Sequence, residues 1–184
     1  MDKYKDLYDS SYFSGRNSND LKRLKSFHLE KELLKKHANF KGKVCDIGCS
    51  TGEFLKEISW EGERYGMEIS DIAVLAAKKN GINFDKNITN VKDYFDLAID
   101  FSSHVSVESF LSNPQEAFLD NIDIPIKNIR FLNDVDFKGK YVYISTDRAL
   151  VDSHDGHYAN RIEIKCDPYG ASKFIGELIV QYSS

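Results

Sequence analysis

The sequence predicts an α/β fold in which a mostly parallel sheet of about five strands lies between two layers of helices. Three observations support this prediction. From Lys41 onward, short runs rich in β-branched and aromatic residues alternate with segments of helical periodicity. The 144 residues from Lys41 to the end hold about five units of roughly 30 residues, the size of a strand–helix–strand unit. A hydrophobic share of 41% is enough for a buried core, which excludes a wholly disordered chain.

Five segments are expected to form the strands: Val44–Ile47, Arg64–Ile69, Ile82–Phe84, Phe95–Ile99 and Tyr141–Ile144. The expected helices cover 19–37, the residues after Gly52, the residues after a cap at Ser70 or Asp71, 107–119, a second segment near 124–132, and the segment from Tyr169. In the helix after Ser70, the apolar face is expected to comprise Ile72, Leu75 and Ala76. Helices between parallel strands place a ligand crevice at the carboxyl ends of the strands.

Residues 1–40 are expected to form an N-terminal arm and a helix, and residues 41–184 a single domain. Lys plus Arg is 25 and Asp plus Glu is 29, so the net charge of −4 argues against a nucleic-acid partner or a membrane surface. No apolar run approaches the roughly 20 residues that cross a bilayer, and no secretory signal is visible. The three cysteines contain no Cys-x-x-Cys pair, which favours reduced thiols. A cytoplasmic location is therefore expected.

A glycine-containing turn, Gly48–Gly52, lies between the first expected strand and a helix. Its glycines permit a tight turn and a close approach of a ligand to the backbone. Glu68 follows twenty residues after Gly48, where a carboxylate can accept both hydroxyls of a ribose. The turn is neither Gly-x-Gly-x-x-Gly nor a Walker A loop, so a nucleoside without phosphate fits better than a pyrophosphate. The alternative is a structural turn beside a surface glutamate.

Residues 44–55, followed by Tyr65–Ile69, resemble motifs I and II of class I S-adenosylmethionine-dependent methyltransferases over about residues 38–100. The resemblance implies a Rossmann-like fold and a turn that holds the methionine and ribose parts of S-adenosyl-L-methionine. The implied cofactor-binding residues are Asp46, Gly48, Cys49, Ser50, Gly52 and Glu68. Asp85 or Asn87 is implied to lie beside the adenine. Cys45 is expected in the core, and Cys49 to be a partly exposed thiol.

Tyr169 and Lys173 are four residues apart at the start of the last helix, so they lie on one face of it. A nearby ammonium lowers the pKa of a tyrosine and makes it a usable general acid or base. A hydroxyl at the end of the fifth expected strand, Thr146 or Ser145, is placed to share a substrate oxygen.

This second constellation resembles extended short-chain dehydrogenase/reductases over about residues 94–180, and in particular NAD-dependent sugar-nucleotide epimerases and dehydratases. It includes Tyr141–Asp147 and the run Pro168–Lys173. The resemblance implies a catalytic set of Tyr169, Lys173 and Thr146, NAD(P) as cofactor, and a nucleotide sugar as substrate. It also implies a role in sugar-nucleotide or surface-polysaccharide metabolism.

The chain departs from both families. It lacks the Gly-x-x-Gly-x-x-Gly turn that the reductases use for NAD(P), and it ends at Ser184, where both families usually continue. The expected domain is thus methyltransferase-like over 41–93 and reductase-like over 94–184, and uncovered apolar faces favour pairing with a second copy. His154 and His157 have a spacing that metal ligands use, but a polar loop without metal is expected.

Three hypotheses follow. The first is a methyltransferase that acts on a small acceptor, and it ranks ahead because the cofactor-holding half of such a fold is the N-terminal half. The second is an NAD(P)-dependent epimerase, dehydratase or reductase that uses Tyr169 and Lys173. The third is a non-catalytic hybrid domain that binds a nucleotide or another chain.

Overall fold

The computed structural model describes residue 13 and residues 21–84, 95–103, 112–146, 149 and 168–183. These residues form two compact units, each of which is described by itself. The first contains residues up to Phe101 together with Val135–Val142, and the second contains Ser102–Asp134 and Tyr143–Ser184.

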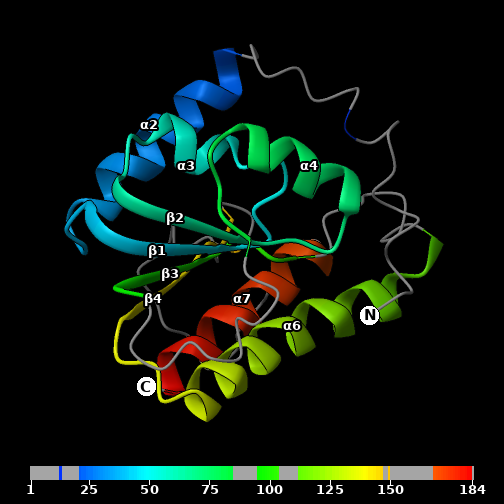
Figure 1. Cartoon of the computed structure of the whole chain (residues 1–184). Helices are drawn as coiled ribbons and strands as arrows, with labels where there is room; N and C mark the ends of the chain where they lie inside the picture. Colours follow the sequence, from blue (N-terminus) through cyan, green and yellow to red (C-terminus); the bar gives the residue numbers. More distant parts are fainter. Residues whose placement is uncertain are drawn as a thin grey trace, which may run out of the picture. The chain divides into compact units, whose positions relative to one another are not determined.

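A four-stranded, all-parallel sheet forms the centre of the first unit (Figure 1). Its strands are β1 (Lys41–Ile47), β2 (Glu61–Met67), β3 (Leu97–Asp100) and β4 (Lys140–Tyr143), in the spatial order β2-β1-β3-β4. The strand β1 pairs with β2 from Lys41↔Glu61 to Ile47↔Met67, and with β3 from Val44↔Leu97 to Ile47↔Asp100. The chain therefore reverses its direction of winding between β1 and β3, where parallel α/β sheets open their ligand crevice.

The expected strand at Ile82–Phe84 is reduced to one bridge, in which Asn83 pairs with Tyr65 of β2. The main-chain N–H of Asn83 donates to Arg64 O at 2.8 Å, and that of Gly66 donates to Asn83 O at 3.0 Å. The sheet thus has four strands instead of about five, with this bridge in the position of the fifth. The α/β class and the parallel sheet agree with the sequence-based prediction.

The two central strands are almost free of contact with solvent. Val44–Ile47 of β1 and all four residues of β3 are buried, including the carboxylates Asp46 and Asp100 at their ends. Nearly continuous apolar runs are typical of parallel strands that are covered on both faces. Burial of a carboxylate is unfavourable unless it is paired or hydrogen-bonded, so these two acids are candidates for a functional role.

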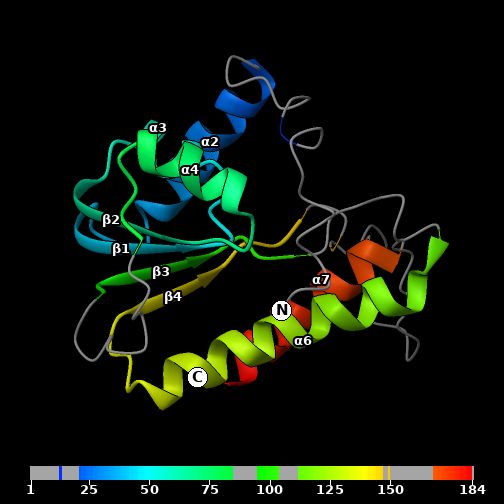
Figure 2. The same ribbon diagram turned by 45° about the vertical axis from the view of Figure 1, so that its right-hand side comes forward.

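Three helices of the first unit, α2 (Leu21–Leu34), α3 (Glu53–Glu57) and α4 (Asp71–Lys79), cover one face of the sheet (Figures 1 and 2). Ser70 caps α4, because its hydroxyl accepts the N–H of Ala73 at 3.4 Å. The predicted apolar face of α4 is wrong. Ile72 and Leu75 are 45% and 64% exposed, whereas Ala73 and Ala77 are buried. Small residues on the buried face let α4 approach the turn closely, since a Cβ on Gly52 would lie 3.1 Å from Ala77 Cβ.

The second unit contains two helices that lie side by side, α6 (Pro114–Asp134) and α7 (Pro168–Tyr182) (Figures 1 and 2). One continuous α6 replaces the separate helices that were predicted near 107–119 and 124–132, and it contains the buried Pro125. The segment 104–111 of that prediction lies outside the described residues. None of the helices in the described part of the chain is long and apolar enough to cross a membrane.

Candidate functional site

The turn from Gly48 to Gly52 is held in a conformation that demands its glycines. Gly48, Ser50 and Gly52 all adopt left-handed backbone angles, with φ of 80°, 50° and 72°. The N–H groups of Gly48 and Cys49 both donate to the carbonyl oxygen of Met67, at 2.8 and 3.1 Å. The turn is therefore fastened to the end of β2, and these two N–H groups are already committed to a protein acceptor.

Glu68 lies against this turn, as the spacing predicts. Its Oε2 accepts the N–H of Ser50 and its Oε1 accepts the N–H of Ser70, both at 2.9 Å. The carboxylate thereby joins the turn to the start of α4. A carboxylate oxygen can accept two hydrogen bonds. Each oxygen of Glu68 accepts one of the two main-chain N–H groups and therefore retains capacity for a ligand hydroxyl.

Asp46, the last but one residue of β1, is 1% exposed, and its Oδ1 has no hydrogen-bond partner. Burial raises its pKa well above the usual range, and repulsion from Asp100, Glu68 and Glu30 raises it further. The carboxyl groups of Asp100, Glu68 and Glu30 therefore lie within electrostatic reach of Asp46, and two of the four, Asp46 and Glu30, have an unsatisfied oxygen. The sequence indicated Asp46 and Glu68 as site residues but did not indicate Glu30 and Asp100.

Asp100 ends β3 and accepts a hydrogen bond from the hydroxyl of Tyr141 on β4. The signal for Asp100 in the sequence was a carboxylate directly after the apolar run Leu97–Ile99. Cys49 corrects another expectation: it is only 5% exposed, and burial, followed by repulsion from Asp46, raises the pKa of its thiol above the ordinary value. It is therefore an unreactive buried thiol rather than a partly exposed one.

The second constellation lies in the second unit. Tyr169 is half-buried in the first turn of α7, and Lys173, one turn later, is 2% exposed. The ammonium of Lys173 lies 4.2 Å from the centre of the Tyr143 ring, a cation–π contact. Thr146, the third member of the predicted set, is half-buried in the segment after β4. The catalytic assignment of these three residues stays a prediction.

A buried polar pair that the sequence did not indicate supports this part of α7. Asn121 of α6 donates from Nδ2 to the hydroxyl of Ser172 at 3.1 Å, and that hydroxyl donates to the carbonyl oxygen of Tyr169 at 2.7 Å. Asn121 and Ser172 are 1% and 0% exposed. The two residues connect α6 to the turn of α7 that carries Tyr169.

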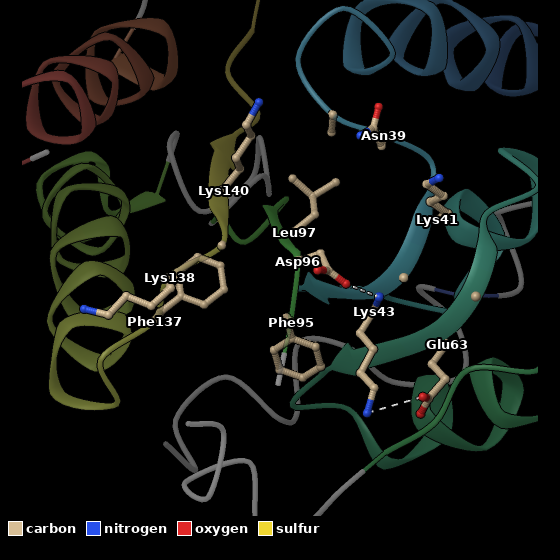
Figure 3. A pocket seen from close by; sticks show the side chains of 14 residues that line it. Asn39, Lys41, Lys43, Glu63, Phe95, Asp96, Leu97, Phe137, Lys138 and Lys140 are labelled. Carbon is tan, nitrogen blue, oxygen red and sulfur yellow. Dashed lines mark hydrogen bonds and ion pairs between the residues drawn. The ribbon is translucent and has the colours of Figure 1, made fainter. Parts of the chain in front are cut away.

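An open groove of about 980 Å³ lies at the amino ends of the strands, away from the glycine turn (Figure 3). Asp96 forms part of its floor and accepts the N–H of Lys43 at 2.7 Å, while the Lys43 ammonium pairs with Glu63 at 3.3 Å. The ammonium groups of Lys41, Lys138 and Lys140 point away from one another (Figure 3). The groove therefore has no set of cations that converges on a ligand.

Several predicted candidates lie outside the described residues, namely Asp85, Asn87, His154 and His157. Among the side chains that the structure describes, no three His, Cys, Asp or Glu residues are grouped so that they could hold a metal ion.

The parallel sheet, its strand order and the turn after β1 define a Rossmann-like α/β protein. No protein-family model matches the sequence, and no curated protein matches it significantly. Three solved epimerase structures are similar in fold. They are the UDP-Glc/GlcNAc 4-epimerase of Campylobacter jejuni (18% identity, TM-score 0.56), the epimerase Mth375 of Methanothermobacter thermautotrophicus (20%, 0.55) and the UDP-glucose 4-epimerase of Bifidobacterium longum in complex with NAD+ and UDP (16%, 0.53).

These alignments cover 77–78% of this chain and 48–49% of the epimerases, so the chain spans about half their length. At such identities the similarity shows the fold alone. The plantazolicin methyltransferase BpumL in complex with S-adenosylhomocysteine (SAH) is also similar, at 17% identity over 94% of this chain and 67% of that one, but its TM-score of 0.44 is too low to support a common fold. Solved structures with some similarity to this chain therefore include proteins of both kinds, but only the epimerases support the fold.

Proposed function

We propose that this protein binds S-adenosyl-L-methionine at the Gly48–Gly52 turn and transfers the methyl group to a small acceptor. The observation that carries the proposal is the carboxylate of Glu68, held 2.9 Å from the Ser50 N–H with capacity left for ribose hydroxyls. Asp46, with its buried and unsatisfied Oδ1, supplies an acceptor at the same end of β1. The residues that line this end of the sheet therefore fit the ribose and amino-acid parts of the cofactor.

The hydrogen bonding of the turn favours this cofactor over a dinucleotide. A pyrophosphate is bound by free backbone N–H groups at a turn and helix start. Here the N–H groups of Gly48, Cys49 and Ser50 all donate to protein acceptors. A nucleoside without phosphate does not need those donors.

The charge of the site favours the same choice. The carboxyl groups of Asp46, Glu68 and Asp100 are close enough to interact electrostatically. Such a group of acids attracts a ligand that carries a sulfonium and an ammonium, and it repels a pyrophosphate.

When bound, the cofactor supplies an electrophilic methyl group on its sulfonium. The contribution of the protein is to orient the reacting groups in line and at short distance, which accounts for most of the rate in such displacements. Glu68 and Asp46 fix the two ends of the cofactor, so no universal acid or base is required of this chain. The resemblance of the C-terminal half supports an acceptor among the small molecules of sugar-nucleotide or surface-polysaccharide metabolism.

Isothermal titration with SAH and with NAD+ tests the proposal. The wild-type chain is expected to bind SAH and not NAD+. Glu68→Gln, which halves the acceptor capacity toward the ribose, is expected to weaken SAH binding by about tenfold or more. Glu61→Gln, a change at an exposed glutamate at the start of β2, is the matched control. Folded wild-type protein that gives no heat with SAH at high micromolar concentration would rule the proposal out.

A second candidate is an NAD-dependent sugar-nucleotide epimerase, dehydratase or reductase that uses Tyr169 as acid or base, Lys173 to lower its pKa and Thr146 to orient the sugar oxygen. Two observations favour it: Lys173 is buried one turn after Tyr169, and the fold is similar to that of solved epimerases. This candidate requires NAD(H) to bind or to co-purify, and Tyr169→Phe to abolish a change in nicotinamide absorbance. If both cofactors fail to bind, a non-catalytic domain that pairs with a second copy remains, and light scattering measures that pairing.

A further inference from the structure

Two carboxylate oxygens on different elements of the first unit are buried without a hydrogen-bond partner: Oδ1 of Asp46 on β1 and Oε2 of Glu30 on α2. Buried polar atoms in folded proteins are nearly always satisfied, and an unsatisfied acceptor lowers stability. Glu30 plays no part in the predicted methyltransferase motifs. Its unsatisfied oxygen therefore calls for a separate explanation.

Aromatic contacts direct the face of α2 that carries Glu30 toward the carboxyl end of the sheet. The rings of Phe27 and Phe54 are 5.5 Å apart, and those of Phe54 and Phe101 are 4.7 Å apart. Phe101 directly follows β3, and Glu30 lies three residues after Phe27, on the same face of the helix. The hydroxyl of Ser26 donates to Glu30 Oε1 at 2.9 Å, which fixes the carboxylate and leaves Oε2 unpaired.

The charges around this pair are predominantly negative. The charge of Glu30 acts on Asp46, together with those of Asp100 and Glu68. The nearby cation on α2, Arg23, pairs with Glu53 at the start of α3 at 3.2 Å. Burial raises the pKa of Glu30, while Ser26 and Arg23 lower it. Two buried acceptors in a negative environment are suited to a cationic group that brings its own donors.

We propose that Glu30 and Asp46 together bind the ammonium group of the amino-acid part of the ligand, so that Glu30 determines whether an amino-acid-bearing nucleoside is preferred. This assignment rests on the proposed function, in which that group is the α-ammonium of S-adenosyl-L-methionine. An ammonium has three N–H donors, and the two unsatisfied oxygens accept two of them. Glu30 thereby makes α2 a part of the binding site.

Two probes test the assignment by titration calorimetry: SAH, and 5′-methylthioadenosine, which has the same nucleoside but no amino-acid part. Glu30→Gln is expected to weaken SAH binding by about 10- to 100-fold, since a hydrogen bond to a charged group is lost, and to leave methylthioadenosine binding unchanged. Glu32→Gln, on the exposed side of the same helix and paired with Lys35, is the matched control and is expected to change neither.

Proton release gives a second readout at mildly acidic pH. Both carboxyls must be ionised to hold an ammonium, and burial favours their neutral forms in the free protein, so wild-type protein is expected to release more protons on binding SAH than Glu30→Gln does. The other charged groups that act on the pair are Glu68, Asp100 and Arg23. Proton release is measured by repeating the titration in buffers of different ionisation enthalpy.

The outcomes separate the two claims. SAH binding that Glu30→Gln leaves unchanged, or an equal loss of affinity for both probes, overturns the role of Glu30 while the proposed function stands. Absence of SAH binding to the wild-type chain overturns the proposed function, and the role of Glu30 with it.

Discussion

Replacing Asp46 with asparagine should make this protein more stable at neutral pH while weakening ligand binding. Asparagine keeps the shape of the side chain and removes a charge that is buried to 1% exposure and repelled by three other acids. Because the folded pKa of Asp46 lies above its ordinary value of 3.8, the folded state holds the proton more tightly than the unfolded chain does. Between those two pKa values the stability of the wild type must therefore fall as pH rises.

The magnitude follows from proton linkage. Each unit by which folding raises the pKa of Asp46 lowers the free energy of unfolding of the wild type by about 1.4 kcal/mol. This loss is complete once the pH exceeds the pKa of the folded state. Asp46→Asn does not titrate, so its advantage in the free energy of unfolding should grow by about 1.4 kcal/mol per pH unit through this window. Replacing a destabilising functional residue commonly makes a protein more stable and weakens its binding of ligand.

Urea unfolding of the wild type and the variant at steps between about pH 5 and about pH 8 measures the effect. Asp123→Asn, which removes an exposed acid paired with Lys127 at 3.2 Å, is the control and should change stability by less than about 1 kcal/mol. If the difference between Asp46→Asn and the wild type is the same at every pH, or if the variant is less stable throughout, the account of Asp46 as a destabilising buried acid is wrong.

Three further substitutions test the packing that positions the sites. Gly52→Ala should lower the free energy of unfolding by about 2–4 kcal/mol, because φ is 72° and a Cβ would meet Ile82 Cγ1 at 2.5 Å; an unchanged urea midpoint would contradict this. Asn121→Ala should lower the free energy of unfolding by about 1–3 kcal/mol in the same assay, because the Ser172 hydroxyl loses a buried donor. An unchanged free energy of unfolding would show that this pair does not stabilise the fold. Trp60→Phe should lower the free energy of unfolding by about 0.5–1.5 kcal/mol, because the indole N–H donates to a main-chain carbonyl at the start of β1 at 3.0 Å. An unchanged melting temperature in thermal unfolding would argue against that hydrogen bond.

The strands and the glycine turn were predictable because local sequence determines them. Four expected strands are present, and the left-handed angles at Gly48 and Gly52 are those that only glycine adopts freely. Glu68 contacts the turn because β1 and β2 run parallel and end together at Ile47↔Met67. Element order and spacing were sufficient for this part of the candidate site.

The buried faces of the helices were not predictable from hydropathy. The helix α4 packs through alanines against a glycine and leaves Ile72 and Leu75 exposed, so close approach, rather than apolar area, decides its orientation. The helix α2 similarly exposes Leu21 and Leu33, at 72% and 57%, although both are large apolar residues. A pattern of large apolar residues therefore identifies the helix but not the surface that it buries.

The burial of charged residues was also not predictable from the sequence. Lysine is usually exposed, yet Lys173 is 2% exposed, with its ammonium over the ring of Tyr143. Glu30 lies in a helix whose other charged residues are mostly in solvent, and only the contacts of Phe27 with Phe54 show which way it faces. Such residues depend on tertiary contacts that neither periodicity nor spacing indicates.

The two family resemblances make different demands on the Gly48–Gly52 turn, and the hydrogen bonds of the turn favour the proposed cofactor over a dinucleotide. A dinucleotide would need the N–H groups of Gly48, Cys49 and Ser50, which Met67 O and Glu68 already accept. It would also bring a pyrophosphate toward Asp46, whose charge is already opposed by neighbouring acids. Both costs arise in the first unit and neither depends on the Tyr–Lys pair of α7. A nicotinamide function at this turn would therefore require its main-chain hydrogen bonds and its carboxylates to change, whereas a cationic nucleoside requires neither change.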